Sequence, residues 1–250
     1  MTLGLPPDAW AAAALSLQVS AWATALSLPF GLAAAMALAR GRFWGRGALD
    51  LLVHAPLVMP PVATGYLLLL AFGPNGPLGA PLERWFGVGF AFQWTGAALA
   101  AAVMGFPLLV RAIRLSLEAV DPRMEEAAAT LGAGRLARFM WVTLPLIAPG
   151  VLVGAVLCFA RAMGEFGATI TFVAAIPGRT ETLPAAIYAL TQTPGGDAAA
   201  LRLTLVSIGV AVAALALSEA LSRRMQRRLG RSGAKRSAHG PDAKRIQNGS

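Results

Sequence analysis

The stretch EAAATLGAGRLARFMWVTLP, residues Glu126–Pro145, is a polar and basic interruption between two long hydrophobic segments of this chain. The segments on either side, Thr95–Val110 and Leu146–Ala175, have the composition of helices that cross a bilayer. A charged stretch between two such spans lies in water, and its arginines favour the cytoplasmic side of a membrane. The sequence therefore predicts a cytoplasmic docking loop in a membrane protein.

The composition of the whole chain agrees with a membrane location. Hydrophobic residues make up 56% of the 250 residues, charged residues make up 13%, and the mean hydropathy is +0.62. In an ordinary soluble domain about a quarter of the residues are charged. We expect an all-α integral membrane protein, because a helix satisfies its backbone hydrogen bonds internally and no alternating strand pattern is present.

The basic residues are concentrated after the last hydrophobic segment. Nine of the 21 Lys and Arg residues lie between Arg223 and Arg245. This placement favours a cytoplasmic tail near anionic lipid over a nucleic-acid site, so no nucleic-acid partner is expected. Cys158 is the only cysteine and lies in an apolar run. We interpret it as a small packing residue, because a single cysteine forms no internal disulfide and the spacing of metal ligands is absent.

Five segments are apolar enough to cross the membrane as helices. They are Trp10–Ala39, Leu49–Phe72, Thr95–Val110, Leu146–Ala175 and Leu203–Leu221. Arginines cluster after the first segment, between the third and fourth, and after the fifth. This distribution predicts an amino terminus outside and a carboxyl terminus in the cytoplasm.

One membrane domain with short polar ends is expected. Its parts are an extracytoplasmic amino terminus (1–9), a transmembrane domain (10–229) with the docking loop at about 118–145, and a tail (230–250). The tail is polar and lacks apolar periodicity, which predicts disorder. The first apolar run is interpreted as a span and not as a cleaved signal peptide, because Asp8 is the only charge before Arg40.

The second segment contains Met59-Pro60-Pro61 near its centre. A proline inside a helix removes a hydrogen bond and clashes with the preceding turn, so this helix must be kinked or broken. Broken backbone at membrane depth is tolerated where it is buried in protein or lines a wet cavity. Pro60 and Pro61 are therefore candidates for a transport pathway, with a simple packing kink as an equal alternative.

A shorter apolar run, Leu183–Leu190, lies between the fourth and fifth segments. It has too few residues to cross the hydrocarbon core. We expect a re-entrant or surface helix.

Within the docking loop, Asp121-Pro122 predicts the start of a helix of about ten residues, because Asp is a good cap and Pro fits the first position. Gly132 and Gly134 predict its end. One face of this helix carries small and apolar side chains that suit a groove in a partner. That face consists of Met124, Ala127, Ala128 and Leu131. The alternative is a helix that lies on the lipid surface.

Arg161 and Glu165 are charged residues inside the fourth segment, where each costs about 2.5–3.5 kcal/mol at the bilayer centre. We expect them to face the interior of the bundle, although Arg before Glu is the weaker order for direct pairing on a helix. They form either a gate near the pathway or an ion pair that locks helices together.

Four neighbours belong to the same candidate gate. They are Gly164 and Gly167, which permit a kink or close helix approach, and Thr169 and Thr171. The threonine hydroxyls either line a path or bond back to their own helix.

The spacing Glu126-Ala127-Ala128, three residues, Gly132, nine residues, Val142, one residue, Leu144-Pro145 is similar to the EAA signature of ABC-importer permeases. Val142 stands where that pattern has Ile. Three further stretches are LSLPFG (Leu26–Gly31), HAPLVMPPVATGYLLL (His54–Leu69) and ARAMGEFGATITFVAAIPGRTETLPAAIYALTQTPGG (Ala160–Gly196). Together they resemble molybdate ABC-transporter permeases, and GEFGAT is shared more loosely with sulfate and thiosulfate permeases.

The resemblance covers roughly Ala9–Arg224 and implies a type I ABC-importer transmembrane domain with five helices and a coupling helix. It implies a homodimer, two cytoplasmic ATP-binding subunits, and an extracytoplasmic oxyanion-binding protein, in a bacterial inner membrane. Glu126, Gly132 and the docking face would couple to the ATPase. ATP and Mg would be bound by the partner, because no G-x-x-x-x-G-K-[ST] motif occurs here. No cofactor or catalytic residue is expected in this chain.

Other functions remain open on the sequence. A permease for sulfate, thiosulfate or tungstate would share the architecture, and pore chemistry does not separate these ions. A membrane-embedded enzyme or a signalling anchor is a different class. An intramembrane hydrolase needs a nucleophile and a base within the spans. The pair Arg161 and Glu165, together with His54, does not supply them. We expect His54 to be structural.

Overall fold

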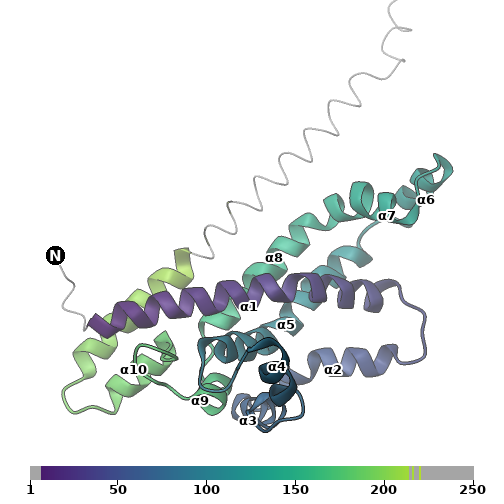
Figure 1. The fold of residues 1–250 in the computed structure, drawn as a ribbon. Helices are drawn as coiled ribbons and strands as arrows, with labels where there is room; N and C mark the ends of the chain where they lie inside the picture. Colours follow the sequence, from purple (N-terminus) through teal and green to yellow (C-terminus); the bar gives the residue numbers. More distant parts are fainter. Residues whose placement is uncertain (1–6, 214–215, 217–219, 221–250) are drawn as a thin grey trace, which may run out of the picture.

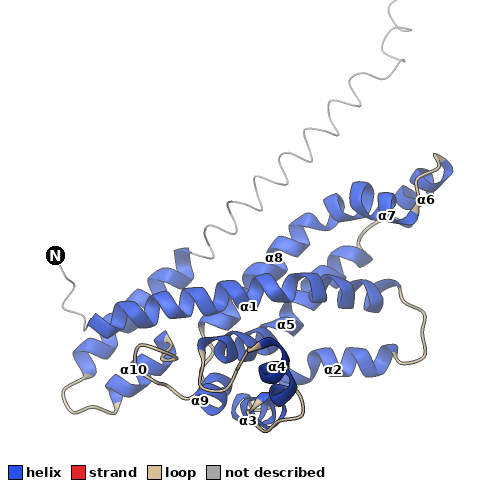
Figure 2. Cartoon of the chain, viewed as in Figure 1, coloured by secondary structure: helices blue, strands red, loops and turns tan. Residues whose placement is uncertain are grey.

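The structure is a computed structural model that describes residues 7–213, 216 and 220, and in these residues the chain is helical and contains no strand (Figure 1; Figure 2). Its helices are α1 (Pro7–Arg40), α2 (Arg46–Val58), α3 (Pro61–Phe72), α4 (Gly79–Phe86), α5 (Trp94–Glu118), α6 (Pro122–Thr130), α7 (Arg135–Arg138), the π-helical turn η1 (Phe139–Thr143), α8 (Leu144–Met163), α9 (Gly167–Val173) and α10 (Leu183–Thr191). Residues 197–213 form a further helix.

The three long helices α1, α5 and α8 pack against one another and form the centre of the molecule. Ala97, Ala100 and Ala101 of α5 are fully buried. A Cβ added to Gly154 of α8 would lie 3.0 Å from the carbonyl oxygen of Leu109 of α5. Small residues of this kind let helix backbones approach closely, which is how membrane helices gain packing contacts.

Three helical stretches of the described chain are long and apolar enough to cross a membrane: Ala9–Arg40, Trp94–Glu118 and Arg135–Met163. The bent pair α2 and α3 adds a fourth if it is counted as one span. The expected fifth span, Leu203–Leu221, lies partly outside the described residues, so five crossings stay a prediction. Most of the expected amino terminus (1–9) and the whole tail (230–250) also lie outside them.

The second expected span is broken rather than kinked. α2 ends at Val58, α3 begins at Pro61, and the two helices are bent by 119°. Met59 is extended, with φ −73° and ψ 142°, as a residue before proline prefers. Pro61 occupies the first turn of α3, where its missing N–H is not needed. The proline pair therefore starts a new helix in a new direction.

The fourth expected span, Leu146–Ala175, is placed differently by the structure. Its helix already begins at Arg135 and ends at Met163, so the last part of the expected docking loop is helical. Pro145 cannot donate a backbone hydrogen bond, and its ring crowds the carbonyl one turn earlier. The wider turn η1 ends at Thr143, two residues before Pro145, and accommodates this defect. Sequence reasoning treated the charged residues of this stretch as loop, although they extend the helix.

The run Leu183–Leu190 forms the short helix α10, as expected. Its first N–H, that of Leu183, donates a hydrogen bond to Oγ of Ser16 at 2.7 Å. Leu183 is fully buried. This bond fixes α10 against α1.

Candidate functional site

The helix predicted to dock on a partner is α6, and it has the ends that the sequence predicted, with one exception. Asp121 Oδ1 accepts the N–H of Arg123 at 3.0 Å, and Pro122 occupies the first turn. Gly132 has φ +83°, a left-handed conformation that favours glycine and ends the helix. Gly134 is instead extended, with φ −64° and ψ 166°, and it begins α7. α6 is therefore a separate helix of nine residues.

The predicted docking face of α6 is open to its surroundings. Met124 is 53% exposed and Leu131 is 88% exposed. The other predicted coupling residues are exposed (Glu126, Ala127, Gly132) or half-buried (Ala128). Figure 1 shows α6 and α7 at one end of the molecule, away from α9 and α10. An exposed apolar face on a projecting helix suits binding in a groove.

Glu125, which sequence reasoning did not single out, joins α6 to the body of the protein. Its Oε1 accepts hydrogen bonds from Nη1 of Arg40, the last residue of α1, and from the hydroxyl of Thr143, the last residue of η1. These partners are 85 and 18 residues away along the chain. Such contacts leave no local sequence pattern, which explains why this residue was missed.

The electrostatics of Glu125 favour its charged form. Burial alone would raise the pKa of the carboxyl. The hydrogen bonds from Arg40 and Thr143, together with attraction by Arg40 and Arg138, outweigh burial and lower the pKa below its usual value. α6 is thus held to the bundle by an ionised carboxylate.

Arg161 and Glu165 meet where the fourth span breaks. Arg161 Nη1 lies 2.5 Å from Glu165 Oε2, and the Glu165 side chain is only 2% exposed. Glu165 Oε1 accepts the N–H of Ala168 at 2.8 Å, so the same carboxylate caps the first turn of α9. Glu165 is buried, as expected for an interior residue, whereas Arg161 is partly exposed, with 29% of its side chain accessible. The two residues pair despite the unfavourable order because α8 ends at Met163, between them, and helical spacing no longer applies.

The two helix breaks lie against each other, because α3 packs on α9. A Cβ added to Gly167 would lie 2.7 Å from Cβ of Pro61. A Cβ added to Gly65 would lie 2.4 Å from the carbonyl oxygen of Ala168. Side-chain atoms do not approach other atoms this closely, so both contacts depend on glycine. The structure thus brings together Pro61 and Gly167, which the sequence placed in one candidate gate.

The remaining gate candidates surround this contact. Thr169 donates its hydroxyl proton to the carbonyl three residues earlier, and Thr171 donates to the carbonyl four residues earlier, both at 2.9 Å. Both hydroxyls therefore bond back to the local backbone, the second of the two expected arrangements. Gly164 is exposed just after α8, and Pro60 is exposed just before α3.

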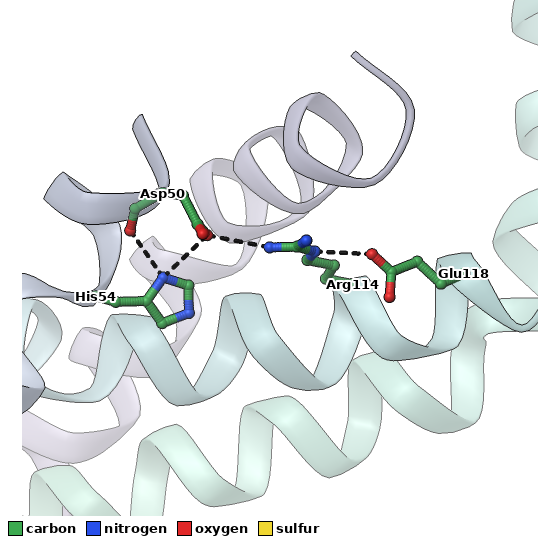
Figure 3. A network of polar contacts seen from close by, with 4 residues as sticks. All are labelled: Asp50, His54, Arg114 and Glu118. Carbon is green, nitrogen blue, oxygen red and sulfur yellow. Dashed lines mark hydrogen bonds and ion pairs between the residues drawn. The ribbon is translucent and has the colours of Figure 1, made fainter. Parts of the chain in front are cut away.

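A second polar network joins α2 to α5 (Figure 3). Arg114 donates from Nη1 to Asp50 Oδ1 at 3.0 Å and from Nε to Glu118 Oε1 at 2.8 Å. Nδ1 of His54 lies 2.9 Å from the carbonyl oxygen of Asp50 and 3.3 Å from its Oδ1. The network fixes the beginning of α2 beside the end of α5, and it gives His54 a structural position.

An apolar groove of about 750 Å³ lies between α1, α2 and α5. Aliphatic and aromatic side chains make up most of its lining, with few hydroxyls such as those of Ser27 and Thr95. An oxyanion needs hydrogen-bond donors or positive charge, so the groove does not suit one. In the described part of the chain, no three His, Cys, Asp or Glu side chains are grouped as metal ligands.

Known proteins similar to this chain are transport permeases. It is 56% identical to the molybdenum transport system permease protein ModB of Escherichia coli (strain K12). The alignment extends over 222 residues and covers 89% of this chain and 97% of that protein. It is 52% identical to the protein of the same name from Haemophilus influenzae, over 86% of this chain and 94% of that one. The sulfate transport system permease protein CysW of Synechococcus elongatus is 39% identical, over 85% of this chain and 75% of that protein.

The fold is also that of a known transporter chain. A chain of a bacterial alginate ABC transporter, crystallised with an alginate pentasaccharide-bound periplasmic protein, matches with a TM-score of 0.71 at 20% identity, over 90% of this chain and 81% of that chain. A family model described as "Binding-protein-dependent transport system inner membrane component" matches residues 27–227. The chain therefore belongs to the family of binding-protein-dependent transport system inner membrane components.

Proposed function

We propose that this chain is the membrane-spanning permease subunit of an ATP-driven oxyanion importer whose substrate is molybdate. The observation that carries the substrate is the 56% identity to a molybdenum transport permease over 97% of that protein's length. The sulfate permease named above is less similar, at 39% identity. A permease for sulfate, thiosulfate or tungstate is the alternative.

The complete transporter contains two copies of this chain around a twofold axis, two cytoplasmic ATP-binding subunits and an extracytoplasmic oxyanion-binding protein. A single copy has too few long helices to enclose a gated path, which favours a symmetric pair. The amino terminus lies outside the bacterial inner membrane, and the basic tail (230–250) lies in the cytoplasm, following the distribution of arginine.

ATP and Mg are bound by the ATPase partner, and this chain receives the resulting movement. The exposed face of α6 enters a groove of that partner, with Glu126 offering it a charge and Gly132 allowing the turn that follows. The projecting position of α6 and the 88% exposure of Leu131 support this role. Closure of the ATPase subunits then moves α6.

The gate lies where the two broken helices meet. Its residues are Pro60, Pro61, Arg161, Gly164, Glu165, Gly167, Thr169 and Thr171. Two broken helices that pack on each other support this assignment. Both breaks lie in segments expected to cross the membrane, where irregular backbone is tolerated only inside protein or beside a wet cavity. Arg161 is the intramembrane cation nearest the break, and the buried Glu165 neutralises it. An ion is therefore not held tightly, as passage requires.

Uptake of labelled molybdate at trace concentration tests the proposal, in cells with and without this chain. Loss of uptake without the chain, with competition by excess tungstate but not by excess sulfate, is the expected result. Unchanged molybdate uptake together with lost sulfate uptake would overturn the substrate and keep the permease. Failure of the chain to co-purify with any ATPase subunit would favour a membrane-embedded enzyme or anchor instead.

A further inference from the structure

The carboxylate of Glu125 lies where three parts of the chain meet. One oxygen, Oε1, accepts hydrogen bonds from Arg40 at the end of α1 and from Thr143 at the end of η1, inside the helical stretch Arg135–Met163, while Glu125 itself belongs to α6. Its side chain is 22% exposed. We call Arg40, Glu125 and Thr143 the α6 anchor.

The two neighbouring glutamates of α6 point in different directions. Consecutive residues on a helix are separated by about 100° around its axis. Glu125 therefore faces the protein's own helices, and Glu126 is exposed on another side. Among the residues that the structure describes, the side chain of Glu126 has no hydrogen bond or ion pair. One carboxylate is thus bonded within the chain, and the next is available to a partner.

The anchor is connected to the gate by a single helix. Thr143 directly precedes α8, which continues to Met163 and carries Arg161 near its far end. A helix of 20 residues is about 30 Å long. α8 is also packed against α5 and α1. A displacement of its first turn is therefore passed along a stiff element to the break between α8 and α9.

We propose that Glu125 is a positioning residue that transmits the movement of α6 to α1 and α8, and so couples the ATPase to the gate. This inference rests on the proposed transport function. Without the anchor, α6 still presents its exposed face to the ATPase, but it loses the hydrogen bonds that join it to the end of α1 and to the end of η1. Binding of the ATPase and transmission of its movement are then separate properties, carried by different residues of one helix.

The test uses the complete transporter, with its ATPase subunits and binding protein, in proteoliposomes. Glu125→Ala, Thr143→Val and Arg40→Ala each remove one member of the anchor. Glu83→Ala is the matched control, because it removes a carboxylate on α4, outside the anchor and the gate. Co-purification of the ATPase, ATP hydrolysis and molybdate uptake are measured for each. Glu125→Ala should retain the ATPase but lower the uptake per ATP hydrolysed by about fivefold or more, a typical size for coupling between two sites.

Rescue distinguishes a coupling role from a general loss of structure. Arg40→Glu combined with Glu125→Arg restores the opposite charges, and this pair should recover part of the uptake per ATP that each single variant loses. Glu125→Gln, which keeps an acceptor oxygen without the charge, should give an intermediate value.

A spectroscopic measurement follows the anchor directly. With Cys158 replaced by Ala, spin labels at Ala129→Cys on α6 and Gly47→Cys on α2 report the distance between the helices, and a side chain at Gly47 has open space. Glu125→Ala should broaden this distance distribution, whereas Glu83→Ala should leave it unchanged.

Three outcomes are decisive. Normal uptake per ATP in Glu125→Ala would overturn the anchor, and so would loss of the ATPase from this variant, because Glu125 would then act at the partner. Absence of molybdate uptake by the unmodified transporter, with active ATPase, would instead refute the proposed function.

Discussion

Gly65 of α3 and Ala168 of α9 are in backbone contact, so that a Cβ on Gly65 would lie 2.4 Å from the Ala168 carbonyl oxygen. Because this oxygen belongs to the backbone, it cannot move aside as the end of a flexible side chain can. The contact holds together the two helices that follow the breaks at Pro60-Pro61 and at Gly164. The candidate gate is therefore a packed unit.

Gly65→Ala should destabilise the protein by about 1–3 kcal/mol, the usual cost of overpacking. Gly167→Ala, which meets the Cβ of Pro61, should act in the same direction. Thermal unfolding of the purified protein in detergent measures the effect. Gly47→Ala is the matched control, because an added Cβ there meets nothing within 4 Å. Equal unfolding temperatures for Gly65→Ala and Gly47→Ala would contradict the close contact between α3 and α9.

Arg161→Ala should be more damaging than the conservative change Arg161→Lys. The alanine variant leaves the carboxylate of Glu165, which is 2% exposed, without its cation. Removal of one partner of a buried pair costs about 3–5 kcal/mol, and the partial exposure of Arg161 favours the lower end of this range. Adding Glu165→Gln to Arg161→Ala should recover stability, since no buried charge remains. The amount of folded protein extracted from membranes is the measurement, and no recovery in the double variant would show that the pair contributes through shape.

The sequence predicted the parts of the protein that depend on local chemistry. Asp121-Pro122 and Gly132 bound α6 as expected, and Met59-Pro60-Pro61 marked a break, because caps and prolines act on their own neighbourhood. The size of that break, 119°, was not predictable, since tertiary packing of α3 on α9 determines it.

Other features depend on contacts between distant residues. The start of the fourth span at Arg135 was missed because its charged residues suggested a loop, although a helix that projects beyond the apolar core also carries charge. Glu125 was missed because its partner Arg40 is 85 residues away. The coupling face, Glu126 and the gate residues were placed by the structure, but their roles remain predictions.

Gly132→Ala should impair coupling through the backbone rather than through a clash. Gly132 has φ +83° and nothing within 4 Å of an added Cβ, so the left-handed conformation is the sole strain. Such strain costs an L-residue about 1–2 kcal/mol, while Asn tolerates the conformation better. Uptake per ATP should therefore be highest in the unmodified protein, lower in Gly132→Asn and lowest in Gly132→Ala. Equal loss in both variants would indicate that the ATPase contacts the glycine itself.

Glu126→Lys should likewise uncouple transport while the subunit stays inserted in the membrane.

The contribution of Glu125 to stability should depend on pH in one direction. Its pKa in the folded protein is lowered, chiefly by Arg40 and Thr143 acting against burial, from an ordinary value of about 4.3. A group with a lowered folded pKa stabilises the protein above its unfolded pKa and loses this contribution as the pH falls through the folded pKa. The difference in unfolding temperature between the unmodified protein and Glu125→Gln should therefore be constant near neutral pH. It should shrink below about pH 4.3. Thr143→Val removes one of the two hydrogen bonds to the carboxylate. In this background, the unfolding-temperature difference caused by Glu125→Gln should change less with pH. A difference that stays the same into acid would mean that Glu125 stabilises the end of α1 by packing and not by its charge.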